Sequence, residues 1–372
     1  MWTRCRIDRP GDSSSPRAVR DIRRADASAE LVVKPSGAPP TAVTKPLLRV
    51  TQGSSSDGPE HASRDLNTPS RVSSLRVERT LRLLAGFGAL RRDQLESFLL
   101  SDATLTSGSR RVVTHRTLGE LRERGLIQEV ALPGRPSRAS RGYALTEAGH
   151  RLYAARDAAY PRRRIRPAPS VVLLDHAAAL AEIAIAFRDA ALAARDIGLL
   201  WESDWEAVAR IGSTAAIPDA FVTLERGGWL ARAFVEADRS TEWYSAFGNK
   251  VRRYVELYRA EEWRAALATW PLVLTVTTSD AHARSLARVA ERVARAEGGT
   301  RIARAFRCTS LDELHRRGPF GTIWRVGASG EATAIFDPKS AGRLGTLASA
   351  PLPAEGEQQC APLQLIQPNG SR

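Results

Sequence analysis

Hydrophobic residues recur at three- and four-residue steps between Leu75 and Gly125, and they form short runs after that point. The first spacing is typical of amphipathic helices and the second of strands. Gly88 and Gly125 each follow a helical pattern, at the position where a glycine commonly ends a helix. The pattern predicts three helices and then a hairpin, over residues 75–87, 93–99, 109–124, 126–132 and 143–145.

Beyond residue 170 the pattern predicts a mixed α/β region, because helical and strand-like runs alternate. Gly227-Gly228 suits a two-residue hairpin turn, since glycine accepts positive φ at both positions. The order is helix, three strands, helix, strand, helix, strand. The elements are expected at 176–195, 199–205, 220–224, 229–235, a helix carrying Lys250, 272–278, 281–296 and 302–308, with short edge strands near Ile323 and Ala334.

Composition sets the expected domain boundaries. Both ends are rich in small and polar residues without an apolar period, so we expect them to be disordered. The first of these segments is either a basic flexible arm or the result of a misassigned translation start. A basic, proline-rich stretch in the middle is typical of an exposed linker. The predicted organisation is a disordered arm (1–70), a first domain (71–160), a linker (161–170), a second domain (171–340) and a disordered tail (341–372).

Positive charge is concentrated in one block of the chain. Residues 71–170 carry 20 basic and 9 acidic side chains, whereas residues 171–372 carry 24 of each, within a total net charge of +14. A folded block with such an excess is the electrostatic footprint expected of a nucleic-acid-binding domain.

Other classes of protein find no support in the sequence. Cys5, Cys308 and Cys360 are too far apart to suggest a disulfide framework or a thiolate metal site, and the six histidines do not have zinc-ligand spacing. No run approaches the ~18 apolar residues of a membrane span. We therefore expect no membrane association and a cytoplasmic location.

The predicted hairpin around Gly227-Gly228 brings acidic residues together. If Arg226 pairs with Trp229, Asp219 falls directly opposite Glu236. Two facing carboxylates at roughly 5 Å are destabilising unless a cation lies between them. Asp238 lies on the same face as Glu236, because side chains alternate along a strand. The sequence therefore predicts an acidic site of the kind that holds a metal, formed by three carboxylates.

Lys250 is the second unusual feature of this region. It falls inside the apolar stripe of its predicted helix, and a lysine aimed at a core needs a partner. Only 4 of the 55 basic residues are lysines, and Lys250 is the only one in the middle of the chain. Because arginine does not replace a compact ammonium at a close-packed site, we expect Lys250 to contact the nearby acids. The alternative is that Lys250 only neutralises a buried acid.

Three helices followed by a hairpin, with the runs Gly125-Leu126-Ile127 and Tyr143 to Gly149, resemble a winged helix-turn-helix domain. In such domains the third helix enters the major groove and the wing contacts the backbone. The resemblance implies groove contacts from Arg110, Arg111, His115 and Arg116. It implies phosphate contacts from Arg135, Arg138 and Arg141. The alternative is a winged helix that binds protein.

In the second domain, Pro218-Asp219 opens one strand and Glu236-Ala237-Asp238 closes the next, which resembles the restriction-endonuclease-like fold with its mixed sheet. The motif of that fold is Pro-Asp, then Asp or Glu, any residue, and Lys. Its acids bind Mg²⁺, which activates water, and its lysine orients the nucleophile. The resemblance implies Mg²⁺ ligands at Asp219 and Glu236, with Asp238 as a third, and a catalytic role for these acids and a migrated Lys250. Asp238 stands where the motif has lysine, so the site is either catalytic or a scaffold that has lost catalysis.

Taken together, these features are similar to the replication-relaxation family of bacterial plasmids and other mobile elements, over roughly residues 75–330. The resemblance implies an accessory protein of replication or mobilisation that binds double-stranded DNA, with a relaxase or replication initiator as partner and with homodimerisation as an option. The alternative is a non-enzymatic transcription regulator or scaffold whose second domain mediates dimerisation or docking. A nuclease predicts solvent access to the acids, whereas a scaffold predicts a closed, satisfied network. A regulator that responds to a small molecule would need an apolar pocket.

Overall fold

The computed structural model describes residues 71–100, 106–131, 141–161, 170–212, 215–227, 229–239, 244–336 and 363–366, without the side chains of residues 71–74, 229 and 363–366. All of these residues belong to the unit formed by residues 65–372. The predicted arm, most of the predicted linker and most of the predicted tail lie outside the described residues.

The N-terminal part has the predicted three helices and hairpin, with one strand and one helix in addition. Its elements are α1 (Arg71–Phe87), β1 (Ala89–Arg91), α2 (Arg92–Leu99), α3 (Ser107–Glu123), β2 (Ile127–Ala131), β3 (Arg141–Leu145) and α4 (Glu147–Arg156). The strands form an antiparallel sheet in the order β1-β3-β2. Gly88 ends α1 at a φ of 83°, a backbone conformation that glycine adopts without a steric penalty. β1 has only three residues, too few to show a period of two in the sequence.

The C-terminal part is built on a mixed sheet. Its helices are α5 (Val171–Ala194), α6 (Asp204–Ile211), α7 (Tyr244–Ala260), α8 (Asp280–Ala296) and α9 (Leu311–Arg317). Its strands are β4 (Ile197–Ser203), β5 (Ala220–Arg226), β6 (Trp229–Ala237), β7 (Leu272–Thr277), β8 (Phe306–Ser310), β9 (Trp324–Val326), β10 (Glu331–Thr333) and β11 (Leu363–Ile366). They lie in the order β10-β9-β8-β7-β6-β5-β4-β11. β6, β7 and β8 are parallel, and every other neighbouring pair is antiparallel.

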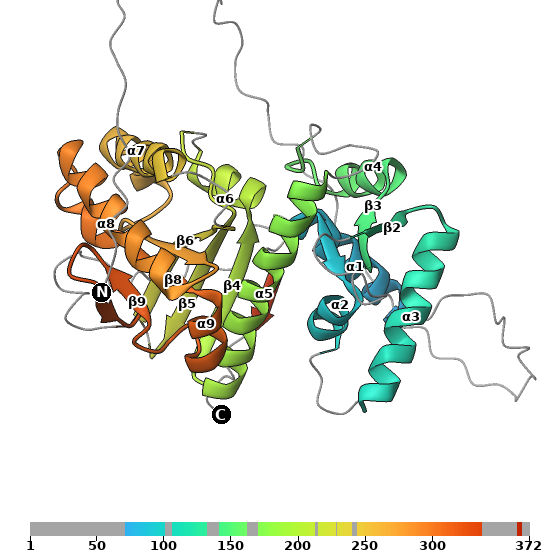
Figure 1. The fold of residues 1–372 in the computed structure, drawn as a ribbon. Coiled ribbons are helices and arrows are strands. Elements are labelled where there is room, and N and C mark those ends of the chain that lie inside the picture. The colour runs from blue at the N-terminus through green and yellow to red at the C-terminus, as the bar shows by residue number, and fades with distance from the viewer. Residues whose placement is uncertain are drawn as a thin grey trace, which may run out of the picture. The chain divides into compact units, whose positions relative to one another are not determined.

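Helices cover both faces of this sheet, as Figure 1 shows. On one face, β4 to β7 pack against α5 and α9. On the other, Phe221 of β5 and Phe234 of β6 pack against α6, α7 and α8. Because side chains alternate along a strand, even-numbered residues of β6 point toward α7, and Glu236 is one of them. The alternation of side chains along β6 therefore places Glu236 on the face of the sheet that α7 covers.

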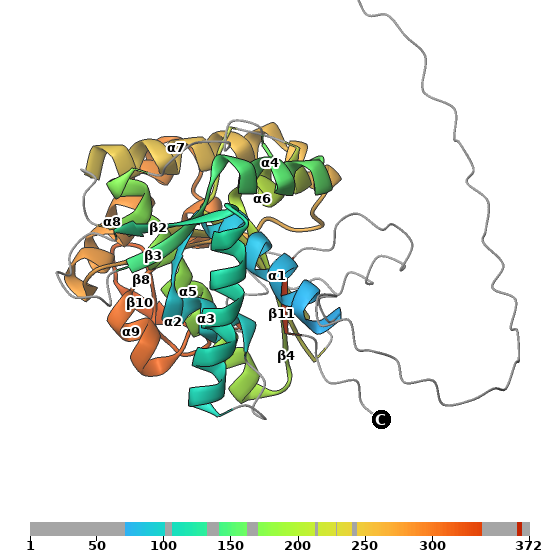
Figure 2. The ribbon, with the colours of Figure 1, turned by 90° about the vertical axis from the view of Figure 1, so that its right-hand side faces the viewer.

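Several elements depart from the expected pattern. The strand expected over residues 302–308 begins only at Phe306, after a 3₁₀ turn at Ile302–Ala305. The strand expected to reach Trp205 ends at Ser203, because Ser203 caps α6 with Glu206 in a capping box. Ser203 and Trp205 are both buried, so a helical turn and a strand look alike in the sequence there. α6 and α9 were not expected. In the tail that was expected to lack structure, residues 363–366 form β11, which pairs with β4 (Figure 2).

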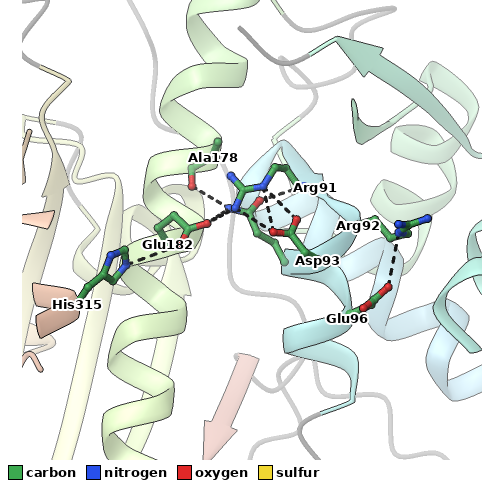
Figure 3. Close-up of polar contacts among 8 residues, drawn as sticks. Arg91, Arg92, Asp93, Glu96, Ala178, Glu182 and His315 are labelled. Carbon is green, nitrogen blue, oxygen red and sulfur yellow. Dashed lines mark hydrogen bonds and ion pairs between the residues drawn. The ribbon is translucent and has the colours of Figure 1, made fainter. Parts of the chain in front are cut away.

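The N-terminal part and the sheet share one apolar core. The Phe87 ring of α1 stacks 5.2 Å from Phe98 of α2 and 6.3 Å from Trp201 of β4, measured between ring centroids. Phe187 of α5 lies 6.2 Å from the same Trp201 ring. α5 contacts both parts, since its Glu182 (Figure 3) accepts a hydrogen bond from Gln94 of α2 and its Phe187 packs on β4. Within the described residues, no helix has both the length and the apolar composition that crossing a bilayer requires.

Candidate functional site

The acidic residues lie at the edge of the sheet where β5 begins and β6 ends. Ala220 pairs with Val235 and Arg226 with Trp229, which confirms the predicted register. The Asp219 amide donates to the Val235 carbonyl at 3.1 Å, so Asp219 lies next to Glu236 across the hairpin. The period of two and the glycine turn were sufficient to place these two carboxylates.

Glu236 is buried, with 1% of its surface exposed, and both of its oxygens accept hydrogen bonds. Lys250 donates to Oε2 at 2.7 Å, and the Tyr254 hydroxyl donates to Oε1 at 2.5 Å. The two donors are four residues apart, on one face of α7. Lys250 therefore contacts a buried carboxylate, as its place in the apolar stripe predicted. Burial raises the pKa of Glu236 to about 7, against the opposing effect of the Lys250 charge.

Asp219 is held by a different pair of donors. The Ala237 amide donates to Oδ2 at 2.8 Å, and Nε2 of His176 lies 3.1 Å from Oδ1. Burial alone would raise the pKa of Asp219, but the hydrogen bond and charge of His176 hold it below its usual value. Burial alone would lower the pKa of His176, but its contact with Asp219 raises it. Each group therefore favours the charged form of the other.

Asp238, which directly follows β6, contacts residues of β7 and α8. The Thr277 hydroxyl donates to its Oδ2 at 2.6 Å. His282 Nε2 lies 3.0 Å from the same oxygen, at the distance of an ion pair but without the geometry of a hydrogen bond. The His282 ring also stacks on Tyr244, with centroids 5.4 Å apart. Asp238 thus belongs to a contact group at the end of β7, distinct from the one around Glu236.

These contacts decide whether the acids fit a divalent cation. Mg²⁺ requires near-octahedral oxygen ligands at 2.0–2.1 Å. The four carboxylate oxygens of Asp219 and Glu236 already accept from, or pair with, protein donors. In the part of the chain that the structure describes, no group of three or more His, Cys, Asp and Glu side chains has an arrangement that could hold a metal ion. In this arrangement the residues therefore do not fit Mg²⁺, which would have to displace Lys250 or His176.

His176 and His282 were missed from the sequence. Each lies on a helix 43 or 44 residues from the acid that it contacts, in α5 and α8. No local pattern connects such positions, since a single histidine on an amphipathic helix is an ordinary residue. Only the packing of α5 and α8 on opposite faces of the sheet brings them to this edge.

The exposed face of α3 is the second candidate site. Arg111, His115 and Arg116 are exposed, and within the described ranges no side chain pairs with them. Arg110 is half-buried and takes part in a polar contact. Of the four predicted groove residues, three therefore have no partner in the part of the chain that the structure describes, and Arg110 has one.

The predicted phosphate contacts of the hairpin are only partly described. Arg141 is exposed and lies 3.4 Å from Glu129 of β2. Glu129 also pairs with Arg122 of α3, so the hairpin and the helix share one carboxylate. Arg135 and Arg138 lie outside the described residues.

The chain is thus a mixed α/β protein in which a helical part with a small antiparallel sheet shares its core with a larger mixed sheet. The sequence model of the Replication-relaxation family matches residues 81–273, from α1 into β7, and the chain belongs to this family. Membership suggests a role in replication or mobilisation. Searches of curated proteins and of solved structures gave no match.

Proposed function

We propose that this protein is a DNA-binding accessory factor in the replication or mobilisation of a plasmid or other mobile element. The N-terminal part acts as a winged helix, with α3 in the major groove of double-stranded DNA and the β2–β3 hairpin against the backbone. A relaxase or a replication initiator is the partner that this role implies.

The observation that carries the proposal is the exposed basic face of α3, where Arg111, His115 and Arg116 have no partner within the described ranges. Helix α3 follows α1, β1 and α2 and precedes the β2–β3 hairpin, an order that supports a winged helix. Arg111, His115 and Arg116 have no ion-pair partner among the described residues, so they contact DNA without first breaking a described pair. Arg122 and Arg124 at the other end of the helix are paired with Glu129 and Glu120. The arginines at the C-terminal end of α3 would therefore have to leave a glutamate before they bind a phosphate, in contrast to Arg111 and Arg116.

The salt dependence of DNA affinity tests this assignment. Fluorescence anisotropy of a labelled duplex, titrated with the full chain at several salt concentrations, gives the slope of log K against log salt. Replacing two phosphate-contacting arginines reduces that slope by about 2, at roughly 0.9 per contact. We expect this reduction in Arg111→Gln/Arg116→Gln, together with weaker binding.

The matched control is Arg122→Gln/Arg124→Gln, which removes the same charge from the paired end of α3. We expect its slope to stay close to the wild-type value. Equal effects of the two double variants would show that only net charge matters, and the groove assignment would then be wrong.

A nuclease is the second candidate, because Asp219 and Glu236 face each other at a strand edge with Lys250 2.7 Å from Glu236. The Mg²⁺ hypothesis stays a prediction, and calorimetry with Mg²⁺ or Mn²⁺ tests it on the full chain and on Asp219→Ala, with plasmid nicking assayed on the same samples. Binding and nicking that both vanish in the variant support a nuclease. A folded wild-type protein without either activity supports a scaffold, in which the closed network joins α5, β5, β6 and α7.

A further inference from the structure

Helix α8 buries one face and exposes the other. Leu286 and Val289 are among its buried residues, which pack with α7 and the sheet. The exposed residues of α8 are four arginines and two alanines: Arg284, Arg288, Arg292, Arg295, Ala281 and Ala296. At about 100° and about 1.5 Å per residue, the arginines fall within an arc of about 80° and extend over roughly 16 Å of the helix. The outer face of α8 is therefore a basic stripe.

Positive charge is in excess around this stripe. Residues 280–305, which comprise α8 and the 3₁₀ turn after it, carry 6 arginines against 3 acidic residues. Residues 171–372 as a whole carry 24 basic and 24 acidic side chains. The C-terminal part of the chain is therefore neutral overall but basic at this surface.

The three acidic residues of this stretch are bound by arginines other than the two in the middle of the stripe. The pairs are Asp280 with Arg284 of α8 and Arg325 of β9, Glu291 with Arg295, and Glu297 with Arg252 of α7. The hydrogen bond from Arg325 holds the pKa of Asp280 below its usual value, and the hydrogen bond from the Ala328 amide does the same for the pKa of Glu291. These carboxylates therefore stay charged and occupied.

Arg288 and Arg292, in the middle of the stripe, have no ion-pair partner among the described residues. Arg288 donates to the Ser285 hydroxyl of its own helix at 3.2 Å. Arg288 and Arg292 are one helical turn apart, about 6 Å along the axis, so both guanidinium groups lie on the same side of α8. An incoming anion therefore meets two arginines that it need not separate from a carboxylate.

The residues of the outer face indicate which class of anion it fits. A helix that lies on a membrane inserts large apolar side chains, and the core of a protein interface is rich in aromatic residues. α8 exposes neither kind, since its exposed residues other than arginine are alanines. The phosphates of a nucleic acid follow one another about every 3.4 Å along each strand, and arginine binds phosphate through two parallel hydrogen bonds. A row of arginines without an apolar centre therefore fits a nucleic-acid backbone.

α8 and α3 lie on opposite sides of the large sheet. α8 packs on the face that α6 and α7 also cover, whereas the N-terminal part packs with α5 on the other face (Figure 1). A duplex is stiff on this scale, because its persistence length is about 150 base pairs. A straight segment bound by α3 therefore does not also pass over α8.

We propose that the outer face of α8 is a second DNA-binding surface, which contacts the phosphates of a duplex segment other than the one at α3. That there are two segments rests on the proposed function of α3, whereas the phosphate contacts of α8 do not. The contacts of α8 are independent of base sequence, because they reach only the backbone. The protein thereby holds two segments of DNA together.

The number of duplexes bound per chain tests the proposal. Sedimentation velocity of the full chain with an excess of a short fluorescent duplex, repeated at increasing salt, gives the molar ratio of DNA to protein in the complex. We expect two duplexes per chain for wild type. We expect one for Arg288→Gln/Arg292→Gln at salt concentrations at which wild type retains both, because the variant loses two phosphate contacts.

Two control variants separate the position of the charge from its amount. Arg288→Lys/Arg292→Lys keeps both charges and should retain two duplexes, since lysine also neutralises phosphates. Arg316→Gln/Arg317→Gln removes the same charge from α9, where both arginines pair with Glu313 on the other face of the sheet, and should also retain two. Loss of the second duplex in the α9 variant as well would show that only net charge matters and would overturn the proposal.

The same measurement distinguishes failure of the α8 site from failure of the α3 assignment. A wild-type ratio of one that Arg111→Gln/Arg116→Gln abolishes overturns the α8 site and leaves the proposed function intact. A ratio of one that only Arg288→Gln/Arg292→Gln abolishes supports the α8 site and refutes the α3 assignment. A ratio of two that persists in folded Arg288→Gln/Arg292→Gln refutes the α8 site. Should that variant lose its helical circular dichroism, Arg292→Gln alone decides in the same way, because it leaves the Arg288–Ser285 contact in place.

Discussion

The Glu236–Lys250 contact and the exposed face of α3 are two charged regions of the same molecule with opposite environments. Glu236 is 1% exposed, and both of its oxygens accept hydrogen bonds from α7. Arg111 and Arg116 are exposed and unpaired within the described ranges. A buried, satisfied charge stabilises the fold only while its partner remains, whereas an exposed, unpaired charge contributes little to the fold and is available to a ligand. The difference teaches that charge alone does not mark a functional site.

Removing Lys250 should give the largest effect on stability. Lys250→Met leaves Glu236 buried beside Asp219 without its cation, and breaking a buried pair in this way costs about 3–5 kcal/mol. Urea unfolding followed by circular dichroism measures the loss, at pH 8, above the pKa of about 7 of Glu236.

The control for this prediction is the double variant Lys250→Met/Glu236→Gln, which removes both charges. It should recover a large part of the lost stability, because the unpaired buried carboxylate is gone. If Lys250→Met lowers the free energy of unfolding by less than about 1 kcal/mol, the Lys250–Glu236 pair contributes no more than an ordinary surface ion pair. Its energetic difference from the exposed arginines of α3 would then disappear.

The contribution of Glu236 to the pH dependence of stability should be smaller and restricted to one window. Burial raises the pKa of Glu236 from 4.5 to about 7, so between these values the native state holds a proton that the unfolded state has released. Stability therefore falls as pH rises from about 4.5 to 7, by about 3 kcal/mol for a shift of this size. In Glu236→Gln this contribution is absent.

Unfolding free energies of wild type and Glu236→Gln, measured at intervals of pH, isolate that contribution. The difference between wild type and variant should change within the window and level off above it. A constant difference across the window would mean that Glu236 keeps its ordinary pKa despite its burial, with Lys250 compensating in full.

Much of the sheet could be predicted because its signals are local. The glycine turn and the period of two gave the β5–β6 register, and the period of 3.6 placed Lys250 against Glu236. α6 was missed because the buried Ser203 and Trp205 fit a strand as well as a helix, and only the capping contact of Glu206 separates the two. Local periodicity therefore predicted which elements form more accurately than it predicted the residues at which they end.

The candidate site was predicted less completely, for a different physical reason. Sequence spacing brought three acids to one edge, but it could not tell which donors surround them. His176, Tyr254 and Thr277 come from three different elements, and together with Lys250 they satisfy the carboxylates that a cation was expected to bridge. The chemistry of an acidic edge depends on these non-local donors, which tertiary packing alone supplies.

The smallest effect on stability is expected from the α3 face, and it completes the comparison. Arg111→Gln/Arg116→Gln removes two exposed charges that have no ion-pair partner among the described residues, so the free energy of unfolding should stay within about 0.5 kcal/mol of wild type. Removing two like charges from a block with 20 basic and 9 acidic residues also relieves repulsion, which opposes any small loss of helix stability. The measurement is the same urea unfolding that is applied to Lys250→Met. A loss of 2 kcal/mol or more would show that these arginines hold the fold, and a fall in DNA affinity in the same variant would then report unfolding rather than a lost contact.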